Sequence, residues 1–154
     1  MKNVQATFGD IEFQASPRKT RRAALLEQMD SVAPWADLVA LVEPHRPRGG
    51  GRGRQPWPTE TLRRMYMVQC WFNLSDEATE DALWDSRAVR AFVGCGEGVP
   101  DATTLLRFRR LLEENSLQEA MLSLVNARLD RAGLLMHGGS IVDTSIVQAP
   151  SSTK

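Results

Sequence analysis

Cysteine and histidine are scarce in this chain of 154 residues, which contains two of each. Cys70 and Cys95 form no CxxC motif, and His45 and His137 are distant from both. A structural zinc site needs four ligands at short spacings, and a disulfide framework needs more cysteines. We therefore exclude both kinds of site and expect reduced thiols, as in a cytoplasmic protein.

Long apolar runs are absent as well. The most apolar stretch, residues 65–74, contains Gln69 and Asn73, whereas a membrane-spanning helix needs about 20 apolar residues. The first three residues do not lead into the apolar segment of a signal peptide. We expect neither a membrane span nor export.

Net charge is also lacking, since 19 basic residues balance 19 acidic ones. This balance excludes a protein that is coated with positive charge. The distribution is uneven: residues 1–64 contain eleven Lys or Arg against seven Asp or Glu, and residues 65–101 contain two against seven. A local basic stripe can attract nucleic acid even where the total charge cannot.

Helical periodicity dominates most of the chain. Ser16 and Pro17 form a helix-start signature for a helix from Arg18 to Val32, and Pro34 precedes a second from Trp35 to Glu43. Pro58 opens a helix over residues 59–72, Ser75 caps the next one, and Asp85 or Ser86 caps a short helix that ends near Phe92. These signals predict a mainly α-helical fold.

The last two predicted helices have the clearest end signals. Asp101 is the expected N-cap of a helix over residues 102–114. Ser116 and Glu119 match a capping box for residues 117–132, and Gly133 is the expected stop. The predicted organisation is an arm (1–15), a helical hairpin (16–44), a linker (45–58), a helical DNA-binding domain (59–133) and one β-strand within residues 138–154.

The predicted linker is the first candidate for DNA contact. It contains four glycines and four arginines and no acid, the arginines being Arg46, Arg48, Arg52 and Arg54. Glycine lets the backbone approach a phosphate or a narrow groove, and arginine supplies charge and forked donors. Residues 52–56 resemble a minor-groove arm of the AT-hook kind, although Gln55 interrupts the pattern. A linker that only solubilises the chain is the alternative.

The helix predicted over residues 102–114 is the second candidate. It offers arginines at or near one side and threonines in its first turn, namely Thr103, Thr104, Arg107, Arg109 and Arg110. A recognition helix presents such residues to the major groove. Two short helices precede it, as in a helix-turn-helix-like arrangement. The alternative is an ordinary solvated helix face.

Aromatic and acidic clusters are explained by packing and surface charge. The aromatic residues lie at core spacing within predicted helices, and Trp57, in the linker, is the exception that can stack on bases. The acids between Asp76 and Asp85 are typical of helix starts and exposed faces, so we expect no metal there. Asp143 differs, because it interrupts a β-branched run over residues 140–147 and is costly to bury without a metal or another partner.

Several of these segments occur in an order that resembles a known family. They are residues 71–76 (WFNLSD), 92–94 (FVG), 99–104 (VPDATT), 108–109 (FR), 139–144 (GSIVDT) and 149–154 (APSSTK). Together they resemble the N-terminal part of bacterial insertion-sequence transposases of the InsH type, in the RNase H-like DDE class. The resemblance runs from about Ser31 to the last residue.

The resemblance implies a function and a site. In that family a helical N-terminal domain binds the terminal inverted repeats of the element, and an RNase H-like domain follows in which Asp, Asp and Glu hold two magnesium ions. The first of those acids maps onto Asp143, as a catalytic and metal-binding residue. The implied partner is double-stranded DNA at the transposon ends, in the cytoplasm at the nucleoid, with a second copy or full-length transposase as a further partner.

The sequence departs from the family pattern because it ends eleven residues after Asp143. The second Asp and the Glu are missing, and one carboxylate leaves most of the coordination shell of two metal ions to water. We therefore expect a truncated RNase H-like domain, weak Mg²⁺ binding and no turnover by this chain alone. A regulatory transposase fragment, or a helical protein-interaction module without a nucleic-acid role, are the alternative functions.

Overall fold

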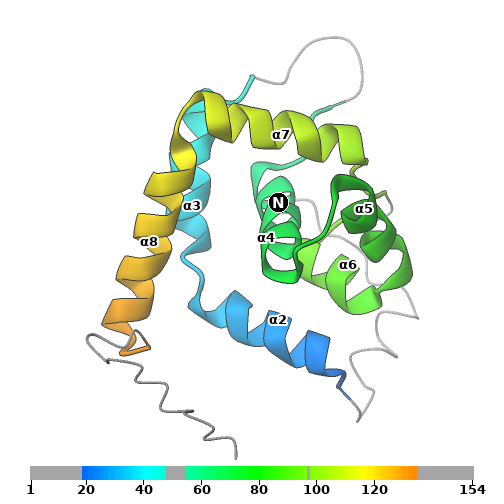
Figure 1. Cartoon of the computed structure of the whole chain (residues 1–154), viewed down its shortest axis with the longest axis horizontal. Coiled ribbons are helices and arrows are strands. Elements are labelled where there is room, and N and C mark those ends of the chain that lie inside the picture. The colour runs from blue at the N-terminus through cyan, green and yellow to red at the C-terminus, as the bar shows by residue number, and fades with distance from the viewer. Residues whose placement is uncertain (1–18, 48–54, 97, 135–154) are drawn as a thin grey trace, which may run out of the picture.

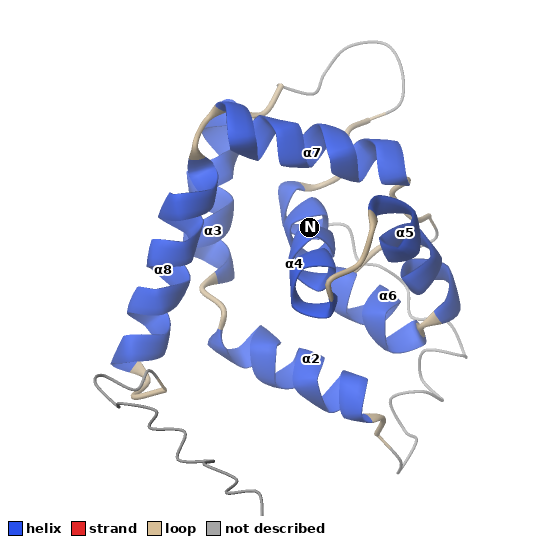
Figure 2. Ribbon diagram, in the orientation of Figure 1, coloured by secondary structure: helices blue, strands red, loops and turns tan. Residues whose placement is uncertain are grey.

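The structure is a computed structural model that describes residues 19–47, 55–96 and 98–134. Within these ranges the chain forms seven α-helices and one 3-10 helix, and no strand (Figure 2). The prediction of a mainly helical protein is therefore confirmed. The predicted arm and the predicted β-strand lie outside the described residues, and the domain boundaries proposed from the sequence stay predictions.

The helices surround a central one, α4 (Figure 1). Helix α4 packs against α3, α5, α6 and α7, while α2 packs against α6, and α8 against α3 and α7. In chain order the elements are α2 (Arg21–Val32), α3 (Trp35–Val42), η1 (Glu43–His45), α4 (Thr59–Phe72), α5 (Asp76–Asp85), α6 (Arg87–Val93), α7 (Ala102–Glu114) and α8 (Leu117–Arg131). Figure 1 shows α2 and α7 on opposite sides of α4.

Two apolar clusters form the core, and both include residues of α4 and α7. The first cluster lies among α2, α4, α5, α6 and α7 and consists of Leu26, Met65, Val68, Leu83, Val89, Val93, Cys95 and Leu105. The second lies among α3, α4, α7 and α8 and consists of Leu38, Val42, Leu62, Met67, Phe108, Leu112, Leu117 and Met121. Because α4 and α7 contribute to both clusters, burial of apolar surface fixes these two helices most firmly.

Most predicted helix ends are confirmed. The side chains of Ser75, Ser86 and Asp101 accept hydrogen bonds from backbone N–H groups three residues later, at 3.1, 3.4 and 2.6 Å. Each bond satisfies a donor that the first turn of a helix leaves unpaired. Gly133 ends α8 with a positive φ of 67°, and its N–H donates to the Asp130 carbonyl at 2.8 Å, as expected for a glycine that follows a helix.

One predicted helix start and one predicted side-chain cap are wrong. The first described helix begins at Arg21 instead of Arg18, because Thr20 adopts an extended backbone and its hydroxyl accepts the Ala23 N–H at 3.1 Å. Ser116 makes no side-chain cap, although α8 does begin at Leu117. Only Asn115 and Ser116 separate α7 from α8, and this tight turn gives Ser116 a left-handed backbone with a φ of 52°.

One arginine on α4 links four helices. The Arg64 side chain, 15% exposed, pairs with Glu60 of α4 at 2.9 Å and with Asp30 of α2 at 2.6 Å. It also donates to the Phe92 carbonyl of α6 at 3.1 Å and lies over the Trp35 ring of α3 at 4.3 Å. Charge pairing and stacking therefore act together at this residue.

The neighbouring Arg63 is fully buried and only partly bonded. Its Nη1 donates to the Leu38 carbonyl at 2.8 Å, and its Nε and Nη2 have no hydrogen-bond partner among the described residues. Burial lowers the pKa of Arg63 to about 10, so the guanidinium is still charged at neutral pH. A buried charge without a paired carboxylate costs folding free energy.

We predict that Arg63→Met stabilises the fold. Methionine fills a similar volume and removes the buried charge, so the free energy of unfolding at pH 7 is expected to rise by about 1–2 kcal/mol. Arg63→Ala leaves a cavity instead and is expected to lower it by about 2 kcal/mol. Urea unfolding followed by circular dichroism measures both changes, and a loss of stability in Arg63→Met would show that the charge has a compensating interaction.

Candidate nucleic-acid interface

Helix α7 has one buried side and one exposed cationic side. Leu105, Phe108 and Leu112 are buried in the core. Thr103, Arg107 and Arg110 are exposed, and their spacing of four and three residues places them on the same side of the helix. The structure thus brings together three of the five residues predicted on this helix, while Thr104 is half-buried and donates its N–H to the Asp101 cap.

Arg109, in contrast, is used within the fold. Its Nη1 and Nη2 donate to the two carboxylate oxygens of Asp76 on α5, at 2.8 and 3.0 Å. Asp76 also accepts a hydrogen bond from the Gln69 side chain of α4 at 2.6 Å. A guanidinium held at both ends by one carboxylate is a poor donor to an external phosphate. We therefore leave Arg109 out of the interface.

A second carboxylate of α5 holds the start of α7. The Glu80 carboxylate accepts the backbone N–H of Ala102, the first residue of α7, at 2.7 Å. Asp76 and Glu80 belong to the acidic cluster that the sequence ascribes to helix starts and exposed faces, and their bonds to α7 were not predicted. Among the described residues, no three His, Cys, Asp or Glu side chains are grouped so that they can hold a metal.

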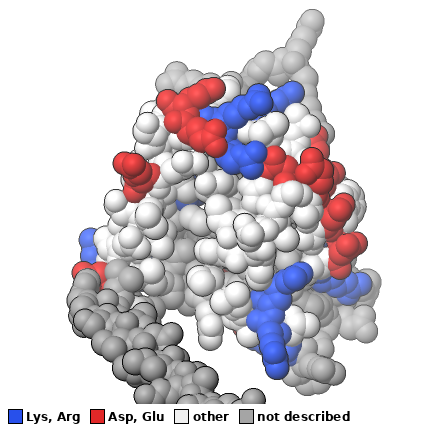
Figure 3. Space-filling view, viewed as in Figure 1, with Lys and Arg blue, Asp and Glu red and all other residues white. Residues whose placement is uncertain are grey.

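The charge around α7 alternates. Figure 3 shows Lys and Arg side chains over the middle of α7, with acidic side chains on both sides of them. Glu113 and Glu114, at the C-terminal end of the helix, are exposed. Positive potential is therefore concentrated at Arg107 and Arg110, and the acidic flanks restrict how an anionic partner can approach.

Arg46, from the predicted linker, also has partners within the fold. Its Nη1 donates to the Trp57 carbonyl at 2.8 Å and to the Thr59 hydroxyl at 2.7 Å. The Thr59 hydroxyl in turn donates to the Glu43 carboxylate. Burial lowers the pKa of Arg46, and the nearby Glu43 carboxylate partly offsets this. Arg46 therefore joins the two ends of the arginine–glycine segment, whose Arg48, Arg52 and Arg54 lie outside the described residues.

The two ends of this segment lie beside the C-terminal end of α7. His45 and Asn115 are hydrogen-bonded, with 2.9 Å between Nδ1 and Oδ1. Trp57 packs against the apolar cluster that includes Phe108 and Leu112 of α7. The two candidate regions, which are about fifty residues apart in the sequence, therefore meet at one end of the molecule.

Trp57, the aromatic residue that the sequence singles out in the linker, is packed within the fold. Trp57 is half-buried, and a Cβ atom on Gly98 would lie only 3.1 Å from its ring, so the glycine allows the two segments to pack closely. Among the described residues, the exposed aromatic is Trp84 of α5, at 59%. The helical periodicity of α5 could have indicated this exposure. Thr79 and Leu83 form the buried side of the helix, and Trp84 follows Leu83 outside that side.

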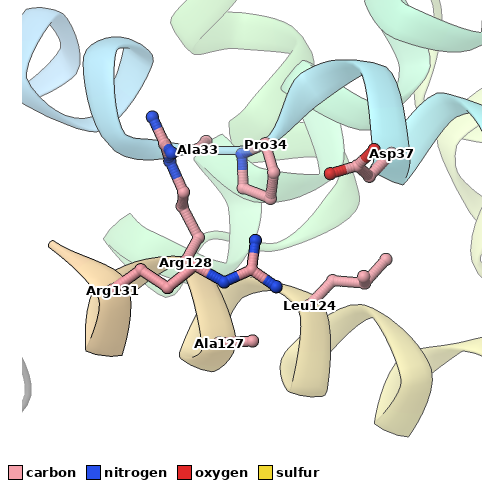
Figure 4. A pocket seen from close by; sticks show the side chains of 7 residues that line it. All are labelled: Ala33, Pro34, Asp37, Leu124, Ala127, Arg128 and Arg131. Atoms are coloured by element: carbon pink, nitrogen blue, oxygen red, sulfur yellow. The ribbon is translucent and has the colours of Figure 1, made fainter.

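A shallow hollow lies away from α7, between the start of α3 and the end of α8 (Figure 4). Pro34 and Asp37 line one side, and Leu124, Arg128 and Arg131 line the other. Figure 4 shows the Arg128 side chain extending toward Ala33. These two exposed arginines lie outside the candidate interface and provide a control for the effect of total charge.

Asp143, the predicted catalytic and metal-binding residue, lies outside the described residues. None of the helices in the described part of the chain has the length and apolar character needed to cross a bilayer.

The chain matches the family described as transposase domain (DUF772) over residues 13–111, and it belongs to this family. The matched region includes all the predicted DNA-contact residues and ends before Asp143. No solved structure matches the chain.

We predict that Asp76 and Arg109 stabilise the fold as a pair. Asp76→Ala and Arg109→Ala are each expected to lower the free energy of unfolding, and a double-mutant cycle should give a coupling energy of about 1–2 kcal/mol, since the pair is bidentate but partly exposed. Urea unfolding of the four proteins measures the coupling. The exposed Glu77→Ala is the matched control, and a coupling energy near zero would contradict this role of the pair.

Proposed function

We propose that this chain is the DNA-binding part of an insertion-sequence transposase and binds duplex DNA with the exposed side of α7. The observation that carries this proposal is the placement of Thr103, Arg107 and Arg110 along one exposed side of a helix whose opposite side is buried. A helix held in this way loses little conformational freedom when it binds. Membership of the transposase domain family supports DNA as the partner.

The chemistry of this face suits the major groove. The groove admits an α-helix, and a guanidinium can donate two hydrogen bonds to the O6 and N7 atoms of guanine. Arg107 and Arg110 supply such groups one turn apart, and Thr103 extends the same side toward the first turn. Asp101 and Glu80 bond to backbone N–H groups at the start of α7, so the start of the helix is fixed.

The arginine–glycine segment is proposed as a second element of the same interface. Arg46 bonds the two ends of the segment together, and the hydrogen bond between His45 and Asn115 holds one of them beside the end of α7. We propose that Arg48, Arg52 and Arg54, which follow Arg46 in the sequence, supply the charge of this element, because arginines in a glycine-rich context suit phosphates or a narrow minor groove. Terminal inverted repeats are the proposed duplex, by the resemblance to InsH-type transposases.

The DDE chemistry implied by that resemblance is proposed only for the family enzyme. There Asp143 would correspond to the first of three acids that hold two Mg²⁺ ions, and these ions would supply Lewis-acid chemistry for DNA strand cleavage. For this chain the proposal is limited to binding. It does not depend on Asp143, and Asp143→Ala is expected to leave DNA affinity unchanged.

We predict that Arg107→Gln/Arg110→Gln weakens DNA binding by about ten-fold or more, because both changes remove charge and forked donors while keeping a polar side chain. Fluorescence anisotropy with a labelled mixed-sequence duplex measures the affinity, and circular dichroism checks that the variant folds. The matched control is Arg128→Gln/Arg131→Gln, which loses the same charge and should bind within about two-fold of the wild type.

Two outcomes would contradict the proposal. One is an unchanged affinity of the α7 variant, and the other is an equal loss in both variants, which would show that only total charge matters. Selection from a randomised duplex pool adds a test of sequence reading. Arg107→Gln should relax the base preference at one or a few positions, as expected of a residue that contacts base edges.

A further inference from the structure

A second group of cationic side chains lies across the molecule from α7. Arg21 and Arg22, in the first turn of α2, are both exposed, and this turn contains no acidic residue. Helix α6 packs against α2 and contributes the exposed Arg87. We refer to Arg21, Arg22 and Arg87 as the α2–α6 surface.

The two acids of α2 are bound by cations other than Arg21 and Arg22. Lys19 is paired with Glu27 at 2.8 Å and cancels that acid. Arg22 lies over the Phe72 ring at 5.1 Å, a contact that orients the guanidinium without using its N–H donors. Asp30, the other acid of α2, is bound to Arg64 at 2.6 Å. The acids of α2 are therefore already paired, whereas its two first-turn arginines have no acidic partner among the described residues.

The α2–α6 surface and the arginines of α7 are visible from one side of the molecule. Figure 3 shows basic side chains at the edge over α2 and beside it, in the same view as those over α7. Figure 1 places α2 and α7 on opposite sides of α4. An extended polyanion on this face would therefore meet positive charge at two separate places.

We propose that the α2–α6 surface contacts backbone phosphates of the same duplex whose groove α7 enters. This inference rests on the function proposed above. The partner is a phosphate backbone because these arginines come from two helices, on a surface that projects no single helix for insertion into a groove. Contacts of this kind position a protein on DNA and carry no sequence information.

The test compares three double variants of the full chain. They are Arg21→Gln/Arg22→Gln on the α2–α6 surface, Arg107→Gln/Arg110→Gln on α7, and Arg128→Gln/Arg131→Gln as the control of equal charge change. Anisotropy titrations use a mixed-sequence duplex about three helical turns long, between 50 and 200 mM salt. Arg87 is left unchanged, so that α6 keeps its own contacts.

Each lost phosphate contact reduces the slope of log affinity against log salt by about 0.9. The α2 variant should therefore lose about two units of slope, and its binding should become weaker by a similar factor for every sequence in a randomised duplex pool. Arg21→Lys/Arg22→Lys should keep most of the slope, because lysine also binds a phosphate as a point charge. The control should keep the wild-type slope.

The outcomes separate this inference from the proposed function. A wild-type slope in the α2 variant, together with weakened binding in the α7 variant, would overturn the inference alone. Absence of duplex binding by the wild-type chain would overturn both. A reduced slope shared by the control would assign the effect to total charge, and a change of base preference in the α2 variant would contradict a purely positioning role. Equal thermal unfolding midpoints would exclude a folding defect.

Discussion

The orientation of helix α7 depends on its bonds with two carboxylates of α5. Asp76 binds both ends of the Arg109 guanidinium, and Glu80 accepts the N–H of Ala102, the first residue of α7. These bonds, with the buried Leu105 and Phe108, fix the rotation of α7 about its axis. Once Arg109 is turned toward α5, the spacing along the helix directs Arg107 and Arg110 outward. The carboxylates of α5 thus help to keep Arg107 and Arg110 on the exposed side of α7.

The arginines divide into two groups by what they contact. Arg46, Arg64 and Arg109 bind carboxylates, carbonyls or hydroxyls within the fold, and Arg63 is buried with one carbonyl partner. The exposed arginines of α2 and α7 have no such role in the described residues. The net charge of zero does not reveal this division, in which Arg64 and Arg109 of the first group form ion pairs with Asp30, Glu60 and Asp76. The electrostatic potential at the surface therefore depends on which charges are already paired within the fold.

Local signals in the sequence predict much of the fold, and long-range pairings limit the prediction of the site. Caps such as Ser75 and Asp101 bond to backbone groups only three positions away, so the local sequence was sufficient to predict them. Ser116 was mispredicted because a two-residue turn between packed helices sets its backbone. The Asp76–Arg109 pair joins residues 33 positions apart, and no local pattern indicates such a partner. The family resemblance predicted the transposase class, which residue patterns alone did not.

Hydrogen–deuterium exchange with and without duplex DNA tests the central claim most directly. If α7 binds the duplex, peptides covering residues 102–110 should exchange more slowly in its presence, because bound DNA restricts the opening of this helix. Peptides covering the middle of α8, around Ser123, should be unaffected. Protection confined to α8, with unchanged exchange in α7, would contradict the account.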